Sequence, residues 1–179
     1  MYNNVIKSET LFTGTIFNVI RKTVTLPNDK IAHRDIVAHD GASAVVAVLD
    51  DGRILLVRQR REAAGEDVLE IPAGRLNESE DPLACIIREL EEETGYHANH
   101  IKLLTKFYPA IGYSTEIIYL FLAEGLTPGQ PHTDEDEFVV AEAYSLDEAL
   151  QMVNNGVIID GKTMLAILWY ARIKCGTGY

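Results

Sequence analysis

The run ASAVVAVLD at residues 42–50 constrains the fold more than any other stretch of this sequence. Almost all of its residues are apolar, so a strand made from it needs cover on both faces of its sheet. The apolar run ILLVRQRR at 54–61 follows Asp51 and Gly52, a pair typical of a tight turn between strands. These two runs therefore predict neighbouring strands in a sheet that is covered on both sides.

The remaining segments supply strands and helices for such an arrangement. Asp81 and Pro82 predict a helix start, because proline is tolerated in the first turn, and Gly95 predicts the end of that helix. Further predicted elements are strands at 101–110, 115–124 and 138–145, a helix at 145–156 with Ser145 as N-cap and Gly156 as stop, and a C-terminal helix at 160–173. We therefore predict an α/β fold in which a mixed sheet is sandwiched between helices.

The first forty residues predict a small antiparallel sheet of their own. Two alternating segments, 17–26 and 30–39, flank the turn-forming residues Pro27, Asn28 and Asp29, which indicates a hairpin. The chain has 179 residues, 47% of them apolar, which suits one core with a small annex. We expect residues 1–40 to form the N-terminal sheet and 41–179 the main domain.

Composition limits the partners and the compartment that we expect. The net charge of −11 argues against nucleic acid, because such binding draws its affinity from lysine and arginine on phosphates. Cys85 and Cys175 match no zinc or redox spacing, and the N-terminal segment lacks the apolar run of a secretion signal. No apolar stretch approaches the roughly 20 residues that cross a bilayer. We expect a cytoplasmic protein without nucleic-acid or membrane partners.

The segment RELEEETG at 88–95 is the most unusual part of the predicted helix at 82–94. On a helical wheel, Glu89, Glu92 and Glu93 lie together, and Glu91 points toward water. Beside the three clustered glutamates lies the predicted packing face, which consists of Leu83, Ile86, Ile87, Leu90 and Thr94.

Two interpretations of this acidic cluster stay open from the residues alone. A solvated acidic face is tolerable, since a like-charged pair at i,i+4 costs only about 0.2–0.5 kcal/mol in water. Beside a packing face the repulsion grows to roughly 3 kcal/mol per pair, and a divalent cation would relieve it. Oxygen ligands without cysteine or histidine favour Mg²⁺, with Mn²⁺ as a substitute, over zinc.

The surrounding residues match a longer pattern, G-x5-E-x7-R-E-U-x-E-E-x-G-U, in which U is a bulky apolar residue. The nine matching positions are Gly74, Glu80, Arg88, Glu89, Leu90, Glu92, Glu93, Gly95 and Tyr96. This pattern resembles the Nudix box, and Tyr96 stands where an aliphatic residue is commoner. The resemblance implies a hydrolase of nucleoside diphosphates linked to another group, which uses Mg²⁺ held by glutamates of a loop-helix-loop.

The resemblance also implies roles within the box. Glu89, Glu92, Glu93 and the carbonyl oxygen of Ala73 are the expected metal ligands. Glu92, Glu93 and Arg88 are expected to be catalytic, with Arg88 orienting a carboxylate one turn along the helix. Glu80 is expected to support the loop first and to act in catalysis second.

The segment after the box is similar to that of ADP-ribose pyrophosphatases. Tyr108, Pro109, Gly112 and Glu116 match by position, although Ala110 and Ile111 depart from the usual small-residue turn. That group implies ligand contacts from Arg34 and Arg61, and a homodimer that exchanges N-terminal strands so that both subunits build each site. A guanidinium suits a diphosphate because it is planar, charged and bidentate.

Each substrate-binding assignment has a simpler alternative. Arg34 could be an ordinary exposed strand residue, and two of the three neighbouring arginines that include Arg61 face water. Glu116 would hydrogen-bond a ribose hydroxyl or cap a strand end, and Tyr113 would stack on adenine or only pack.

The acidic segment HTDEDEF at 132–138 is by default a solvated loop. In the resembling enzymes, an acidic loop at this place supplies the base that deprotonates the attacking water. Glu135 is therefore the expected base and Glu137 an additional metal contact.

The leading hypothesis is Mg²⁺-dependent hydrolysis of ADP-ribose, and of other ADP-sugars, to AMP and ribose 5-phosphate. The alternatives are hydrolysis of another nucleotide-sugar such as GDP-mannose, hydrolysis of an oxidised nucleotide, and a sensor that binds ADP-ribose without cleaving it.

Overall fold

The computed structural model describes residues 4–130 and 138–176 of the chain. Within those residues, no helix combines the length and the apolar character that a bilayer crossing requires.

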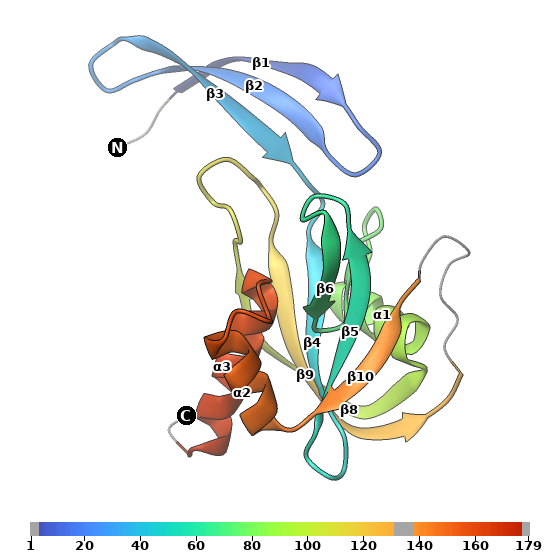
Figure 1. Cartoon of the computed structure of the whole chain (residues 1–179). Coiled ribbons are helices and arrows are strands. Elements are labelled where there is room, and N and C mark those ends of the chain that lie inside the picture. Colours follow the sequence, from blue (N-terminus) through green and yellow to red (C-terminus); the bar gives the residue numbers. More distant parts are fainter. Residues whose placement is uncertain (1–3, 131–137, 177–179) are drawn as a thin grey trace.

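In the described part of the chain, a three-stranded antiparallel sheet forms the N-terminal part and lies at one end of the molecule (Figure 1). Its strands are β1 (Asn4–Thr13), β2 (Asn18–Thr25) and β3 (Ile31–Ala38), and β2 lies in the middle. The predicted hairpin is confirmed as β2 and β3, with Thr25 opposite Ile31. The pattern did not predict β1, because two register irregularities in its pairing with β2 interrupt the alternation of period two.

Among the residues that the structure describes, the main sheet has seven strands. They are β4 (Ala42–Val48), β5 (Ile54–Arg61), β6 (Glu66–Glu70), β7 (Ala73–Arg75), β8 (Tyr96–Phe107), β9 (Ile118–Pro128) and β10 (Val140–Tyr144). Their order is β10-β5-β4-β9-β8, while β6 pairs with β5 and β7 with β4. The sheet is mixed, as predicted, because β4 and β9 are parallel and the other pairs are antiparallel.

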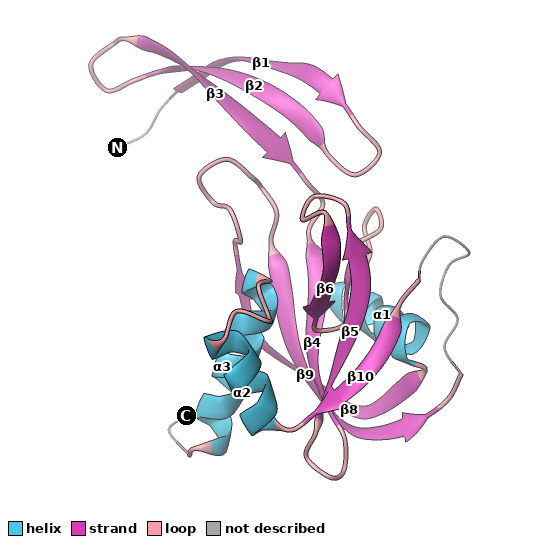
Figure 2. Cartoon of the chain, in the orientation of Figure 1, coloured by secondary structure: helices cyan, strands magenta, loops and turns pink. Residues whose placement is uncertain are grey.

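Helices cover both faces of this sheet (Figures 1 and 2). α1 (Pro82–Thr94) lies on one face, and α2 (Leu146–Asn154) and α3 (Gly161–Lys174) lie on the other. Alternate residues of β4 enter two different cores: Val46 and Val48 pack on the α2 and α3 side, whereas Val45 and Ala47 pack on the α1 side. The apolar run at residues 42–50 is therefore buried on both faces, as predicted.

The predicted ends of α1 are confirmed. The Asp81 side chain accepts hydrogen bonds from the backbone N–H groups of Leu83 and Ala84, at 2.9 and 3.2 Å. Gly95 ends the helix in the left-handed conformation, with φ of 74°, and its N–H donates to the Glu91 carbonyl oxygen. α1 thus follows directly from local sequence.

The predicted packing face of α1 is partly wrong. Leu83 and Ile87 are 41% and 42% exposed, whereas Cys85 and Glu93 are buried together with Ile86, Leu90 and Thr94. The reason is that the loop of β7 packs on the helix, with the Cys85 thiol against the carbonyl oxygens of Gly74 and Arg75. This contact rotates the buried side of the helix away from Leu83 and Ile87.

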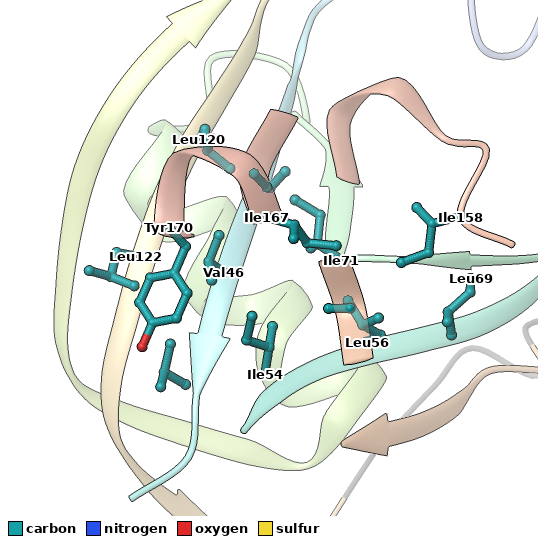
Figure 3. Packing of buried hydrophobic residues seen from close by; sticks show 14 of the residues in the cluster. Val46, Ile54, Leu56, Leu69, Ile71, Leu120, Leu122, Ile158, Ile167 and Tyr170 are labelled. Carbon is teal, nitrogen blue, oxygen red and sulfur yellow. The ribbon is translucent and has the colours of Figure 1, made fainter. Parts of the chain in front are cut away.

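Tyr170 of α3 is 1% exposed and packs among Val46, Ile54 and Leu122 (Figure 3). Its hydroxyl has no hydrogen-bond partner among the described residues. Burial of an unsatisfied hydroxyl costs about 1–3 kcal/mol, so we expect Tyr170→Phe to leave the free energy of unfolding unchanged or to raise it by up to about 2 kcal/mol. Urea unfolding measures this change.

Tyr144→Phe is the matched control, because the Tyr144 hydroxyl donates to Glu142. We expect this control to lower the free energy of unfolding by about 1 kcal/mol. A larger loss for Tyr170→Phe than for Tyr144→Phe would contradict the prediction.

Candidate active site

A cleft of about 1230 Å³ lies where the end of β5, the β7 loop, α1 and the start of α3 meet. Its lining includes Arg61, Ala73, Gly74, Glu89, Glu93 and Glu116. α1 and α3 cover opposite faces of the sheet (Figure 1). Residues of both helices line the cleft. Six predicted site residues therefore line one cleft: Arg61, Ala73, Arg88, Glu89, Glu93 and Glu116.

Glu89 and Glu93 lie on one side of α1, because residues four positions apart differ by only about 40° around a helix. Glu93 is 5% exposed, and its Oε2 accepts a hydrogen bond from the Ala73 N–H at 3.0 Å. A Cβ atom at Gly74 would lie 1.8 Å from Cδ of Glu89. Gly74 thus makes room for the Glu89 carboxylate.

Arg88 joins three carboxylates of the box. Its Nη1 donates to Glu89 at 2.7 Å and to Glu92 at 2.9 Å, while Nε and Nη2 donate to the two oxygens of Glu80. Burial lowers the pKa of Arg88, but the hydrogen bonds that it donates to the three carboxylates raise it overall. The guanidinium is therefore a permanent cation that holds the glutamates in place.

Glu80 has the supporting position expected of it. Its Oε2 accepts the Asn77 N–H at 2.8 Å, so Glu80 connects the loop before α1 to Arg88 on the helix. The hydrogen bonds from Arg88 and Asn77 hold the pKa of Glu80 below its usual value. Below this network, burial raises the pKa of the Cys85 thiol to about 11, so Cys85 remains a neutral packing residue.

Glu92 is separated from the other two clustered glutamates. It lies about 60° from Glu89 in the direction opposite to Glu93. It borders a shallow surface with Ala84 and Ile87 and is held by Arg88. The structure thus places Glu89 and Glu93, but not Glu92, in the cleft lining.

The residues of the cleft fit a hard divalent cation. In residues 4–130 and 138–176, no three acidic, histidine or cysteine side chains are gathered closely enough to enclose an ion. Glu89, Glu93 and Ala73 nevertheless present oxygen donors of the type that Mg²⁺ prefers, and Gly74 leaves the space that Glu89 occupies.

A second group of charges reaches the cleft from β5, β6 and α3. Arg61 donates from Nε and Nη2 to the two oxygens of Glu70, at 2.6 and 2.9 Å, and Lys162 also donates to Glu70. Arg61 and Lys162 both line the cleft, whereas the Glu70 side chain is only 3% exposed. Burial raises the pKa of Glu70, but its bonds with Arg61 and Lys162 outweigh this effect and lower it overall.

Two predicted ligand contacts, Arg34 and Tyr113, are not part of the cleft lining. Arg34 is an exposed residue of β3 and donates from Nη1 to the His33 carbonyl oxygen at 2.9 Å. Tyr113 is 60% exposed, and its carbonyl oxygen accepts the Val37 N–H at 2.8 Å. Glu135 and Glu137 lie outside the described residues.

The structure adds cleft residues that the sequence did not single out. Thr15 and Ile16 of the β1–β2 turn line the cleft, as do His39, Asp160 and Lys162. The Arg75 side chain donates to the carbonyl oxygen of Thr15 at 3.1 Å, which connects the turn to the β7 loop. For Asp160 and Lys162, the only indication in the sequence is the segment from Asp160 to Thr163. That segment predicts the N-cap of a helix but no binding site.

The lowered pKa of Glu70 predicts that the free energy of unfolding depends on pH. Because its folded-state pKa is lowered from the usual 4.5, its contribution is complete above pH 4.5 and is lost as the pH falls through the folded-state value. At pH 7 we expect Glu70→Gln to lower the free energy of unfolding by about 1–3 kcal/mol, and the difference from wild type to shrink below pH 4.5. Urea unfolding from pH 3.5 to 7 measures this.

Glu62→Gln is the control for Glu70→Gln, because Glu62 pairs with Arg60 on the surface with 86% of its side chain exposed. We expect a change within about 0.5 kcal/mol at any pH. A difference between Glu70→Gln and wild type that stays constant down to pH 3.5 would count against this role of Glu70.

This chain was compared with family models and with known sequences and structures. The NUDIX domain model matches residues 39–165. A solved structure of an ADP compounds hydrolase superposes with a TM-score of 0.88 at 20% identity, over 99% of this chain and 97% of that one. This superposition confirms the predicted fold, a Nudix-type α/β/α sandwich preceded by a small antiparallel sheet.

Similar sequences carry three different names. An ADP-ribose pyrophosphatase of Bacillus subtilis (strain 168) is 42% identical over 171 residues, which cover 94% of this chain and 92% of that protein. A methanol dehydrogenase activator of Bacillus methanolicus is 41% identical, over 90% and 89%. A GDP-mannose pyrophosphatase of Yersinia pestis (strain Pestoides F) is 37% identical, over 75% and 71%. The domain match and these identities show that the chain belongs to the NUDIX family.

Proposed function

We propose that this protein hydrolyses the diphosphate bond of ADP-ribose, and of other ADP-sugars, in a Mg²⁺-dependent reaction that yields AMP and ribose 5-phosphate. The observation that carries the proposal is the cleft itself, in which Glu89 and Glu93 share a lining with the guanidinium of Arg61. The similarity to the ADP-ribose pyrophosphatase of Bacillus subtilis supports the choice of substrate.

Some residues of the cleft bind the substrate, and others orient the carboxylates of Glu89 and Glu93. Arg61 binds the diphosphate as a bidentate cation, with Glu70 holding its guanidinium in place. Arg88 keeps the Glu89 carboxylate oriented, and the Ala73 N–H does the same for Glu93. Glu116 lies in the same lining and accepts a ribose hydroxyl.

Glu89, Glu93 and the Ala73 carbonyl oxygen would hold Mg²⁺. Glu92, which lies outside the cleft lining but shares Nη1 of Arg88 with Glu89, and Glu137 are proposed as further ligands. When bound, the ion neutralises phosphate oxygens and makes the attacking water more acidic. Glu135 accepts the proton of that water, as the acidic loop of similar enzymes implies.

We also propose a cytoplasmic homodimer in which residues 1–40 mediate the contact and exchange strands. Exposed apolar side chains on the N-terminal sheet support this assembly; they are Val5, Ile6, Leu11, Phe12 and Ile31. Arg34 and Tyr113 would then serve the cleft of the partner subunit. Both cysteines, Cys85 and Cys175, are free thiols, as expected for a reducing compartment.

Subunit complementation tests the exchange. Arg34→Ala and Glu93→Gln damage different parts of the proposed site, so a mixture of the two inactive variants should regain about a quarter of wild-type activity if each site draws on two subunits. No recovery in a mixed dimer, verified by light scattering and differential tags, would refute the exchange.

A nucleotide panel tests the substrate. ADP-ribose should be cleaved with a higher kcat/KM than GDP-mannose or 8-oxo-dGTP, and EDTA should abolish turnover. Hydrolysis in ¹⁸O-labelled water then shows which product carries the label and hence which phosphorus is attacked. ADP-ribose left intact while another compound is cleaved would replace the proposed substrate.

GDP-mannose is the second candidate, because the Yersinia relative is a GDP-mannose pyrophosphatase. The same panel decides between the two sugars.

A further inference from the structure

Lys162 is a charged residue of the cleft to which the proposed reaction gives no role. It lies in the first turn of α3, and only 13% of its side chain is exposed. Its Nζ donates to Oε2 of Glu70 and, at 3.0 Å, to Oδ2 of Asp160. A lysine that is buried between two carboxylates is held in one place, unlike a solvated surface lysine.

Glu70 connects Lys162 to Arg61, which lines the cleft. Arg61 gives Nε and Nη2 to Glu70, so the edge of the guanidinium that carries Nη1 is the edge that Glu70 does not engage. The Arg61 side chain is 43% exposed, which shows that part of it reaches the open cleft. One buried carboxylate thus orients the guanidinium of an arginine that lines the cleft.

The position of Lys162 depends on a set of hydrogen bonds at the start of α3. Asp160 caps the helix by accepting the Thr163 N–H at 2.9 Å and the Thr163 hydroxyl at 2.6 Å. The Thr163 hydroxyl in turn accepts the Ile71 N–H at 2.9 Å, next to Glu70 at the end of β6. Helix α3 and strand β6 are therefore joined at the point where Lys162 meets Glu70.

We propose that Lys162 is a positioning residue, which holds Glu70 from the α3 side and so presents the Arg61 guanidinium to the diphosphate in the cleft. Without Lys162, the Glu70 carboxylate loses one of its two cations and Arg61 gains rotational freedom. The substrate then binds more weakly, because binding must also pay for ordering the Arg61 side chain. This role rests on the proposed function, since it requires a diphosphate substrate.

The test compares Lys162→Met with Lys162→Arg and with Lys102→Met, which changes an exposed lysine of β8. We expect Lys162→Met to raise KM for ADP-ribose about three- to tenfold with kcat within about twofold of wild type. The Kd for α,β-methylene ADP-ribose, measured by calorimetry, should rise by the same factor. Lys162→Arg should restore both constants to within about threefold, and Lys102→Met should leave them unchanged.

A double-mutant cycle separates positioning from other roles. Arg61→Gln alone should raise KM about 10- to 100-fold, as expected for a charged hydrogen bond to the ligand. In the Arg61→Gln background, Lys162→Met should change KM less than twofold, because it acts through the arginine. If Lys162→Met does not fold, Lys162→Gln takes its place in the cycle.

Three outcomes would overturn the inference alone: a lower Tm with unchanged KM and Kd, no rescue by Lys162→Arg, or an effect of Lys162→Met that persists without Arg61. A wild-type chain that neither cleaves ADP-ribose nor binds its analogue overturns the proposed function, and the positioning role with it.

Discussion

Glu93→Gln is expected to lower kcat for ADP-ribose by about 10²–10³-fold, the loss that follows removal of one preorganised electrostatic group from an active site. Glu93 is buried at the cleft, and its Oε2 accepts the Ala73 N–H. The amide oxygen of glutamine can accept the same hydrogen bond, so the fold should persist while the charge that we propose for Mg²⁺ binding is lost. Steady-state kinetics at several Mg²⁺ concentrations and circular dichroism measure the two effects.

Glu91→Gln is the matched control on the same helix. Glu91 lies outside the cleft lining and pairs with His97, so this variant should keep kcat within about twofold of wild type. Equal losses in the two variants would mean that the acidity of α1 as a whole, and not the position of Glu93, supports turnover.

Gly74→Ala is expected to lower kcat/KM by about 100-fold or more. A Cβ at this position would lie 1.8–2.4 Å from three atoms of the Glu89 carboxylate, far inside the contact distance. Because those atoms are the end of a flexible side chain, Glu89 can move away and the fold survives. Glu89 then leaves its place beside Ala73 and Glu93, and misplacement of a reacting group by about 1 Å costs on the order of 10²-fold.

The measurement pairs kinetics with thermal unfolding. Gly112→Ala is the control, because a Cβ there meets nothing within 4 Å. We expect Gly74→Ala to lose activity with a Tm within a few degrees of wild type, and Gly112→Ala to keep its activity. Full activity in Gly74→Ala would show that the Glu89 carboxylate does not need its present place.

The elements that depend on neighbouring residues were predicted well. The ends of α1, the hairpin of β2 and β3, and Ser145 as the N-cap of α2 all arise from short-range hydrogen bonds and turn geometry. β1 and the short strands β6 and β7 were not predicted. Irregular register obscures β1, and pairing with β5 and β4 creates the other two.

The sequence named six residues that line the cleft, but not how they are arranged. The residue spacing groups Glu89, Glu92 and Glu93, yet only the packing of α1 decides that Glu89 and Glu93 line the cleft. Likewise, Arg61 was identified by resemblance, but its orientation comes from Glu70 and from Lys162, which is 92 residues beyond Glu70.

By itself, the sequence determined the two-sided burial of β4, the limits of α1 and the oxygen-rich chemistry of the box. Local hydrogen bonds and hydrophobic patterning act over a few residues, so they are present in the order of the amino acids. Tertiary structure alone decided the rotation of α1, which exposes Leu83 and Ile87, and the meeting of Arg61, Glu70 and Lys162. Those features depend on contacts between distant segments, whose geometry exists only after the sheet and its helices have packed.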